Sequence, residues 1–262
     1  MEVLKALTEY YGSYDEDNRL CSQHGRVEFL TTMRYVEKNL KPGMRVLEIG
    51  AATGRYSHTL ARQGYKVDAV ELVAHNIDIF KRNTQPGEDV RIFQGNAKNL
   101  TMLGDDTYDI TLLLGPMYHL FTIPEQLEAL SEAIRVTKKG GVIFAAYCGN
   151  EATMVQYCFG RGMIMEQRYR DLVDPVTFKA SSDPAELFQL YRKEDIDALM
   201  AYFPVTRLHY VGTDMATNYM RQTIDQMDEE LFDLYLQYHF AICERSDLVG
   251  ASHHILDIFR KD

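Results

Sequence analysis

Residues 46–55 contain the pattern in this chain that is best suited to binding a ligand. An apolar run ending at Ile49 passes into a turn at residues 50–54 (Gly-Ala-Ala-Thr-Gly) and then into a helical segment. A strand that enters a helix through such a turn places backbone N–H groups and a helix N-terminus beside a ligand. Gly50 permits the tight turn, and Gly54 lets the helix lie close to the strand. Because glycine turns join strands to helices in many folds, the pattern alone also fits an ordinary turn.

A second chemical signal is an acid about twenty residues downstream of the glycine turn. Residues 67–71 read Val-Asp-Ala-Val-Glu, an expected strand that ends at Glu71. A carboxylate at the end of a strand can accept hydrogen bonds from both ribose hydroxyls of an adenosine ligand, although it can also serve only as a helix cap. Together, the two signals predict an adenosine-containing cofactor where the strand order of a doubly wound sheet reverses.

Short β-rich runs alternate with helical segments around these residues. Strands that alternate with helices in this way predict an α/β fold with a parallel sheet covered on both faces. Two late runs would complete a doubly wound, mostly parallel sheet of seven strands. The seven runs are residues 44–49, 65–71, 90–94, 108–114, 141–147, 205–211 and 253–259.

The alternation divides the chain into four parts. Residues 1–43 are expected to form an N-terminal helical lid, and residues 44–149 the cofactor-binding core. Residues 150–204 are rich in Met, Tyr and Phe without clean alternation, which indicates a helical cap insertion over the bound acceptor. Residues 205–262 supply the last strands and a helix that complete the core.

Composition and charge narrow the class of partner. The 262 residues carry a formal net charge of −10, and no dense run of Lys or Arg occurs. A protein that follows a phosphate backbone normally presents a basic face, so nucleic acid and anionic membrane are not expected as partners. No apolar run approaches the ~20 residues of a membrane helix. The oligomeric state is left open.

Cysteines and histidines give no sign of a metal site or of disulfide bonds. The four cysteines are scattered, which indicates reduced and mostly buried thiols. The pair His253-His254 has no metal-ligand spacing to a nearby Cys or Asp, so no bound metal is expected and both are interpreted as structural. The first residues are acidic and amphipathic, unlike a signal peptide, and a cytoplasmic location is expected.

Residues 44–147 resemble the class I S-adenosylmethionine-dependent methyltransferases. The acid and glycines of that family's turn match Glu48, Gly50 and Gly54, while Ala52 replaces the middle glycine. Glu71 matches the ribose-binding acid of the family. The resemblance implies a Rossmann-like core and S-adenosylmethionine as the cofactor, with the methionine amino group held near Glu48.

The same resemblance implies a set of cofactor-binding residues. The adenine-binding turn matches residues 95–97, with Asn96 where the family more often has Asp; an amide oxygen can still accept a hydrogen bond from the adenine amino group. The implied cofactor-binding residues are Glu48, Gly50, Ala51, Thr53, Gly54, Tyr56, Glu71, Leu72, Asn96, Ala97 and Leu114.

Two alternatives use the same residues. A nicotinamide-dinucleotide oxidoreductase would carry G-x-G-x-x-G, which residues 50–54 do not match. Glu48 would also repel a diphosphate. A protein that senses S-adenosylmethionine without catalysis is the other alternative, and a filled pocket beside the methyl group would favour it.

Residues 114–120 (Leu-Gly-Pro-Met-Tyr-His-Leu) are expected to face the methyl group. Amino-group methyltransferases of nucleobases carry a polar residue where this chain has Gly115, which disfavours bases as acceptors. The segment resembles that of bacterial small-molecule methyltransferases, which implies a small acceptor with an O, N or S nucleophile. Tyr118 and His119 are the candidate catalytic residues: His119 as a general base, Tyr118 to orient the acceptor. Simple positioning of the acceptor, or a packing role for both, stays open.

Overall fold

The computed structural model describes residues 2–182 and 184–262. One sheet runs through it in the order β3-β2-β1-β4-β5-β8-β7, and the short β6 pairs with β5. The five strands β3, β2, β1, β4 and β5 run parallel to one another, and β8 is antiparallel to both β5 and β7. The strands are β1 (Arg45–Ile49), β2 (Lys66–Glu71), β3 (Val90–Gln94), β4 (Tyr108–Leu113), β5 (Thr137–Gly149), β6 (Leu190–Tyr191), β7 (Val205–Gly212) and β8 (His254–Lys261). The expected doubly wound, mostly parallel α/β sheet is confirmed, with β6 as a strand that the sequence pattern did not indicate.

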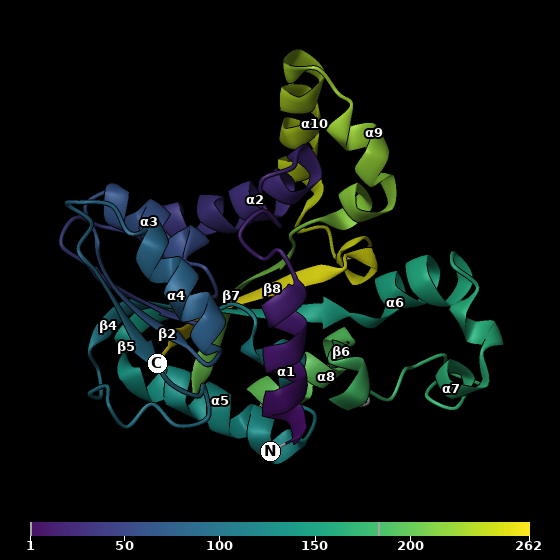
Figure 1. Cartoon of the computed structure of the whole chain (residues 1–262), viewed down its shortest axis with the longest axis horizontal. Coiled ribbons are helices and arrows are strands. Elements are labelled where there is room, and N and C mark those ends of the chain that lie inside the picture. Colours follow the sequence, from purple (N-terminus) through teal and green to yellow (C-terminus); the bar gives the residue numbers. More distant parts are fainter. Residues whose placement is uncertain (1, 183) are drawn as a thin grey trace.

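Helices cover both faces of this sheet (Figure 1). The α-helices are α1 (Glu2–Ser13), α2 (Gln23–Asn39), α3 (Arg55–Arg62), α4 (Ala74–Asn83), α5 (Ile123–Val136), α6 (Asn150–Thr153), α7 (Gln167–Arg170), α8 (Lys193–Met200), α9 (Arg221–Asp225) and α10 (Glu229–Ile242). The shorter helical turns are η1 (Pro116–His119), η2 (Met154–Phe159), η3 (Met163–Met165), η4 (Pro184–Glu186), η5 (Met215–Met220) and η6 (Val249–Ala251).

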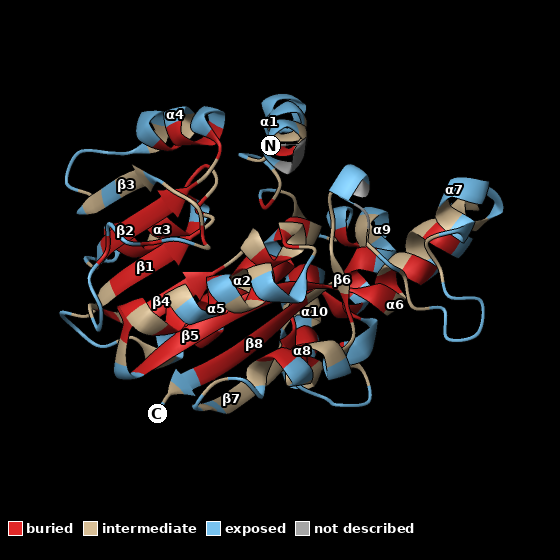
Figure 2. Ribbon diagram, turned by 90° about the horizontal axis from the view of Figure 1, so that it is seen from below, coloured by how far each residue is buried: buried red, intermediate tan, exposed pale blue. Residues whose placement is uncertain are grey.

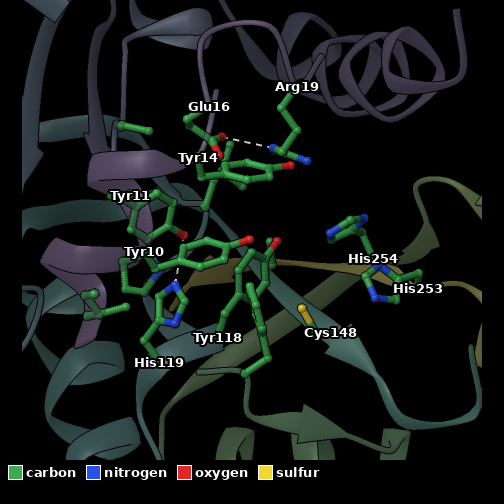
Figure 3. A pocket seen from close by; sticks show the side chains of 18 of the residues that line it. Tyr10, Tyr11, Tyr14, Glu16, Arg19, Tyr118, His119, Cys148, His253 and His254 are labelled. Carbon is green, nitrogen blue, oxygen red and sulfur yellow. Dashed lines mark hydrogen bonds and ion pairs between the residues drawn. The ribbon is translucent and has the colours of Figure 1, made fainter. Parts of the chain in front are cut away.

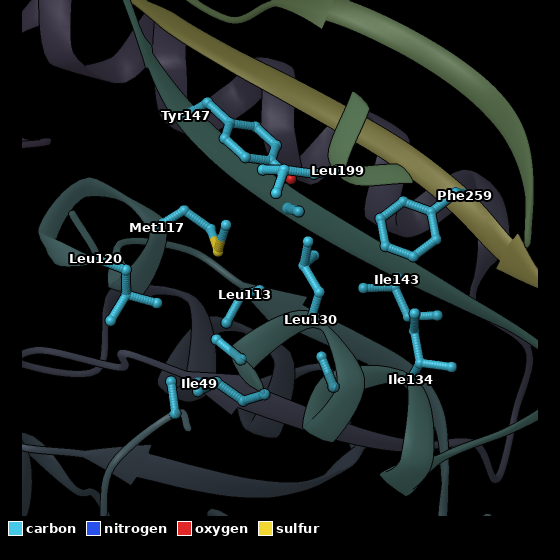
Figure 4. Close-up of a cluster of buried hydrophobic side chains, with 14 of the residues drawn as sticks. Ile49, Leu113, Met117, Leu120, Leu130, Ile134, Ile143, Tyr147, Leu199 and Phe259 are labelled. Carbon is cyan, nitrogen blue, oxygen red and sulfur yellow. The ribbon is translucent and has the colours of Figure 1, made fainter. Parts of the chain in front are cut away.

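Alternate side chains of the central strands pack on opposite faces of the sheet. On β4, Leu113 contributes to a core with α5 and α8, whereas Leu112 contributes to a core with α2 and α3. Figure 2 shows that the inner strands β1, β2, β4, β5 and β8 are mostly buried, whereas the edge strands β3 and β7 are largely of intermediate burial. Figure 4 shows the α5 side of the core. A strand buried on both faces must be apolar at consecutive positions, which explains the three consecutive leucines formed by the last two residues of β4 and Leu114.

The carboxyl ends of the parallel strands lie at one edge of the sheet, and the connection between β7 and β8 returns to the same edge. The antiparallel β8 begins there, because His254 pairs with Cys148 near the end of β5. At this edge the strand order reverses between β1 and β4, which is where ligands bind in doubly wound sheets.

Two expected boundaries differ from the structure. Residues 190–204 were assigned to the cap, but β6 and α8 belong to the core, where Tyr191, Ile196 and Leu199 are buried. At the other end, α2 was assigned to the lid, but it packs on the sheet through Phe29 and Val36. Of the described part of the expected lid, α1 and the loop after it line the cavity at the carboxyl edge, and α2 adds residues such as Glu28 to that lining. In both cases, the helix packs an apolar face against the core, as an amphipathic helix of a globular protein does. Among the described residues, no helix has the length and apolar character needed to cross a bilayer.

Candidate functional site

A cavity of about 1100 Å³ opens at the carboxyl edge of the sheet. We call the part lined by Gly50, Glu71 and Asn96 the turn side, and the part lined by Tyr10, Tyr14 and Tyr118 the tyrosine side. All the sequence-predicted site residues line this cavity except Gly54.

Gly54 lies beneath the cavity, in the packing between two helices. It precedes α3 with φ +93°, and a Cβ atom built on it would lie 2.5 Å from His58 Nε2 and 2.6 Å from Phe80 Cδ2. Its role as a cofactor-binding residue stays a prediction, and in the structure it brings α3 close to α4. Gly50 does line the cavity, with φ +79° and a Cβ position 2.6 Å from Pro116 Cδ.

Glu71 holds the turn that follows β1. Its Oε2 atom accepts from the N–H of Ala52 at 2.9 Å and its Oε1 atom from the N–H of Val73 at 2.8 Å. Ala52, at the position of the family's middle glycine, has φ +47°, a conformation that favours glycine. Burial raises the pKa of Glu71 although these N–H groups oppose the rise. The Asn76 side chain and the Leu72 N–H also approach this carboxylate, which lines the cavity and can accept a ribose hydroxyl there.

Glu48 joins the end of β1 to α3. Its Oε2 atom accepts from the backbone N–H of Ser57 at 2.9 Å and from the Ser57 hydroxyl. Burial raises the pKa of Glu48 to about 8, against these hydrogen bonds. The carboxyl group also borders the cavity, so it can meet a cationic group of a ligand there.

The raised pKa of Glu48 predicts a loss of stability with rising pH. Because the folded protein binds this proton more tightly than the unfolded chain, the free energy of unfolding falls as pH rises from about 4.5 toward 8. Glu48→Gln removes this contribution, so we expect the variant without ligand to gain stability relative to wild type between pH 5.5 and 8. Urea denaturation at both pH values measures the difference. Glu37→Gln, at an exposed position on α2, is the control, and an equal pH dependence of Glu48→Gln and wild type would contradict the prediction.

Asn96 uses its amide oxygen within its own turn. The Oδ1 atom accepts from the N–H of Lys98 at 3.0 Å. The remaining lone pair and the amide NH₂ group are left for a ligand. Leu72, Ala97 and Leu114 add apolar contact on the same side.

His119 has partners on both ring nitrogens. Nε2 lies 3.0 Å from the Tyr11 hydroxyl on α1, and Nδ1 lies 2.7 Å from the carbonyl oxygen of Leu187 (Figure 3). A carbonyl only accepts, so Nδ1 carries the proton and Nε2 accepts from Tyr11. Burial lowers the pKa of His119. These contacts favour a positioning role that ties α1 and the loop at Leu187 to η1, over proton transfer.

Charged groups that the sequence interpretation left unassigned lie across the tyrosine side. Arg19 donates to Glu28 from Nη1, at 2.9 Å to Oε2, and to Glu16 from Nε at 2.9 Å. His254 Nδ1 lies 2.8 Å from Asp214 Oδ2 and 3.2 Å from Glu28 Oε2. His253 and His254, interpreted as structural from sequence, thus line the cavity.

Three residues of the turn side correspond to different parts of an S-adenosylmethionine molecule. Gly50 lines the cavity and packs so closely on Pro116 that a Cβ atom would clash there, and Glu71 places its carboxylate at the end of β2. Glu48 offers a carboxyl group toward the methionine end. The residues therefore suit an adenosine with a cationic amino-acid arm.

Comparison with known proteins agrees with this geometry. The methyltransferase domain family matches residues 46–141. A ubiquinone biosynthesis O-methyltransferase of Hahella chejuensis is 21% identical over 199 residues, covering 74% of this chain and 81% of that protein. A demethylmenaquinone methyltransferase of Lysinibacillus sphaericus is 26% identical over 147 residues, covering 54% of this chain and 58% of that protein.

Solved structures share the fold. A Pyrococcus horikoshii protein superposes with a TM-score of 0.63 at 15% identity, covering 97% of this chain and 99% of that one. An S-adenosylmethionine-dependent methyltransferase of Thermotoga maritima, described as a possible histamine N-methyltransferase, gives 0.56 at 19% identity, covering 100% and 99%. Over residues 46–141 the chain carries a methyltransferase domain, and its relatives and its fold are those of S-adenosylmethionine-dependent methyltransferases.

Proposed function

We propose that this enzyme methylates a hydroxyl group of a small aromatic molecule bound on the tyrosine side of the cavity. The observation that carries the proposal is the lining of that side by aromatic rings. Tyr10 and Tyr14 stack with centroids 5.2 Å apart, and Tyr118 contributes a third ring from η1. Aromatic walls of this kind suit a flat ring. Among O, N and S nucleophiles, the O-methyltransferase names of relatives support a hydroxyl.

Bound S-adenosylmethionine supplies a methyl group on a sulfonium, which is a good leaving group. The chain's own residues then bind and orient. Glu71 accepts the ribose hydroxyls, Asn96 meets the adenine, and Leu114 lines the passage between the two sides. Holding the acceptor oxygen in line with the methyl group, away from water, supplies most of the acceleration in such a displacement.

One further part of the proposal rests on charge. The net charge of −10 supports an acceptor other than nucleic acid.

Transfer of a labelled methyl group to a panel of phenols, catechols, amines and thiols tests the proposal. We expect labelled product from phenols or catechols, and calorimetry to detect binding of S-adenosylmethionine and S-adenosylhomocysteine but not of NAD. Transfer confined to amines or thiols would overturn the hydroxyl assignment. Cofactor binding without transfer to any compound would favour a regulator.

A further inference from the structure

The connection from β7 to β8 has an aspartate near its start and a histidine at its end, and these two residues, 40 positions apart in the chain, lie side by side. Asp214 follows β7, and His254 begins the neighbouring antiparallel β8. Both residues line the cavity. The His254 ring centroid lies 6.0 Å from that of Tyr118, so this pair faces the tyrosine side, where the acceptor is proposed to bind (Figure 3).

Asp214 is held firmly at this place. Its Oδ1 atom accepts from the Ser252 hydroxyl at 2.6 Å and from the backbone N–H groups of His253 at 2.9 Å and His254 at 3.1 Å. Its Oδ2 atom faces His254 Nδ1 at 2.8 Å. The side chains of Asp214, His253 and His254 are close enough to share an ion, with ligand atoms within 4.8 Å of one another. Because four donors already occupy the carboxylate, we interpret the group as a hydrogen-bonded pair and not as a metal site.

The hydrogen bond to Asp214 fixes the His254 tautomer. With Nδ1–H donated to a carboxylate, the neutral ring carries its lone pair on Nε2. Among the described residues, no group forms a hydrogen bond with that atom, and it is not one of the buried polar atoms without a partner. His119 differs, since its Nε2 atom already accepts from Tyr11.

We propose that His254, oriented by Asp214, is the proton acceptor for the hydroxyl group that is methylated. This inference rests on the proposed hydroxyl acceptor. The acceptor oxygen forms its bond to the methyl carbon while the carbon–sulfur bond breaks and leaves a neutral thioether. The hydroxyl proton passes to His254 Nε2, and the Asp214 carboxylate stabilises the resulting imidazolium. The positive charge of the sulfonium thus ends on His254, from which water removes the proton.

The surroundings of His254 set its pKa, and therefore the pH range in which it can accept the hydroxyl proton. Burial lowers its pKa, but Glu28 on α2 and Asp214 outweigh burial and Arg19, so the pKa lies above the ordinary 6.5. Of the other groups nearby, burial lowers the pKa of His253 to about 4 and raises those of Tyr118 and Cys148, so these three stay neutral. A protonated His254 cannot accept a proton. Turnover of a hydroxyl acceptor should therefore rise with pH through a value above 6.5.

Replacing His254 by Gln tests the role in turnover. With a phenolic acceptor, we expect kcat to fall about 10²–10⁴-fold and the rising limb of the pH profile to disappear. Calorimetry should give unchanged affinity for S-adenosylmethionine, which shows that the variant is folded. The matched control is His209→Gln, which removes another histidine bonded to a carboxylate, Glu244, away from the cavity. A His254→Gln variant that keeps its pH profile and loses less than tenfold in kcat would overturn the proposal.

A second measurement does not require turnover. 4-Nitrophenol changes colour when it loses its proton, and it can be bound together with S-adenosylhomocysteine. A protonated His254 beside the bound phenolate should lower the pH of this change by about one unit or more relative to His254→Gln. An equal colour-change pH in the two proteins, or no binding by wild type, would overturn the inference. A difference between them without methylation of any phenol would support proton transfer to His254 and overturn the proposed function alone.

Discussion

Replacing Glu71 by Ala is expected to weaken S-adenosylmethionine binding roughly ten- to a hundredfold. The ribose hydroxyls lose a charged acceptor, which is worth about 1.5–3 kcal/mol. The structure adds a second reason for the loss, because Glu71 also accepts from the N–H groups of Ala52 and Val73. Without it, the turn that holds Ala52 at φ +47° loses its support. Calorimetric titration with S-adenosylmethionine and with S-adenosylhomocysteine measures the change.

Glu71→Gln separates the two causes. The amide keeps one oxygen for the backbone and has nearly the same volume, so the turn is disturbed less while the charge is lost. We expect an affinity between those of wild type and Glu71→Ala, and a smaller fall in the free energy of unfolding. Unchanged cofactor affinity in the alanine variant would contradict the assignment of Glu71 to the ribose.

The turn side of the cavity was predictable because its residues are close together in sequence. Gly50 and Glu71 lie at the ends of adjacent parallel strands, and a strand–turn–helix unit fixes their relation without help from the rest of the chain. The alternation of apolar runs was sufficient to predict the sheet. Gly54 has the conformation expected of that turn but is not among the residues that line the cavity, a distinction that spacing cannot make.

The tyrosine side could not be predicted in this way because its residues come together only in the tertiary structure. Asp214, His254 and Glu28 come from three elements that the sheet order and the packing of α2 bring together. One signal was present: Asp214 closely follows the expected strand at residues 205–211, as an acid ends the strand at Glu71. The partners of His119 were hidden for the same reason, since Tyr11 and Leu187 are distant from it in sequence. The end of the cap was misjudged because β6 has only two residues and α8 only two turns.

Replacing Gly54 by Ala is expected to destabilise the fold more than the same change at Gly64. The two glycines have nearly the same conformation, with φ +93° and +90°, so each alanine costs about 1–2 kcal/mol of backbone strain. At Gly64, no atom lies within 4 Å of the new Cβ position, whereas at Gly54 the Cβ meets His58 and Phe80. His58 cannot easily move, since its Nδ1 atom pairs with Glu88 at 2.7 Å in a buried contact.

The difference between the two variants isolates the contact between α3 and α4. Overpacking of a buried site costs about 1–3 kcal/mol, so the free energy of unfolding should fall by that much more in Gly54→Ala than in Gly64→Ala. Urea denaturation of the protein without cofactor measures both. A shift of α3 would also move the turn at Gly50 and Ala52, so Gly54→Ala should weaken cofactor binding while Gly64→Ala leaves it unchanged. Equal stability losses would mean that α3 moves away from α4 freely, and that Gly54 is required only for its backbone conformation.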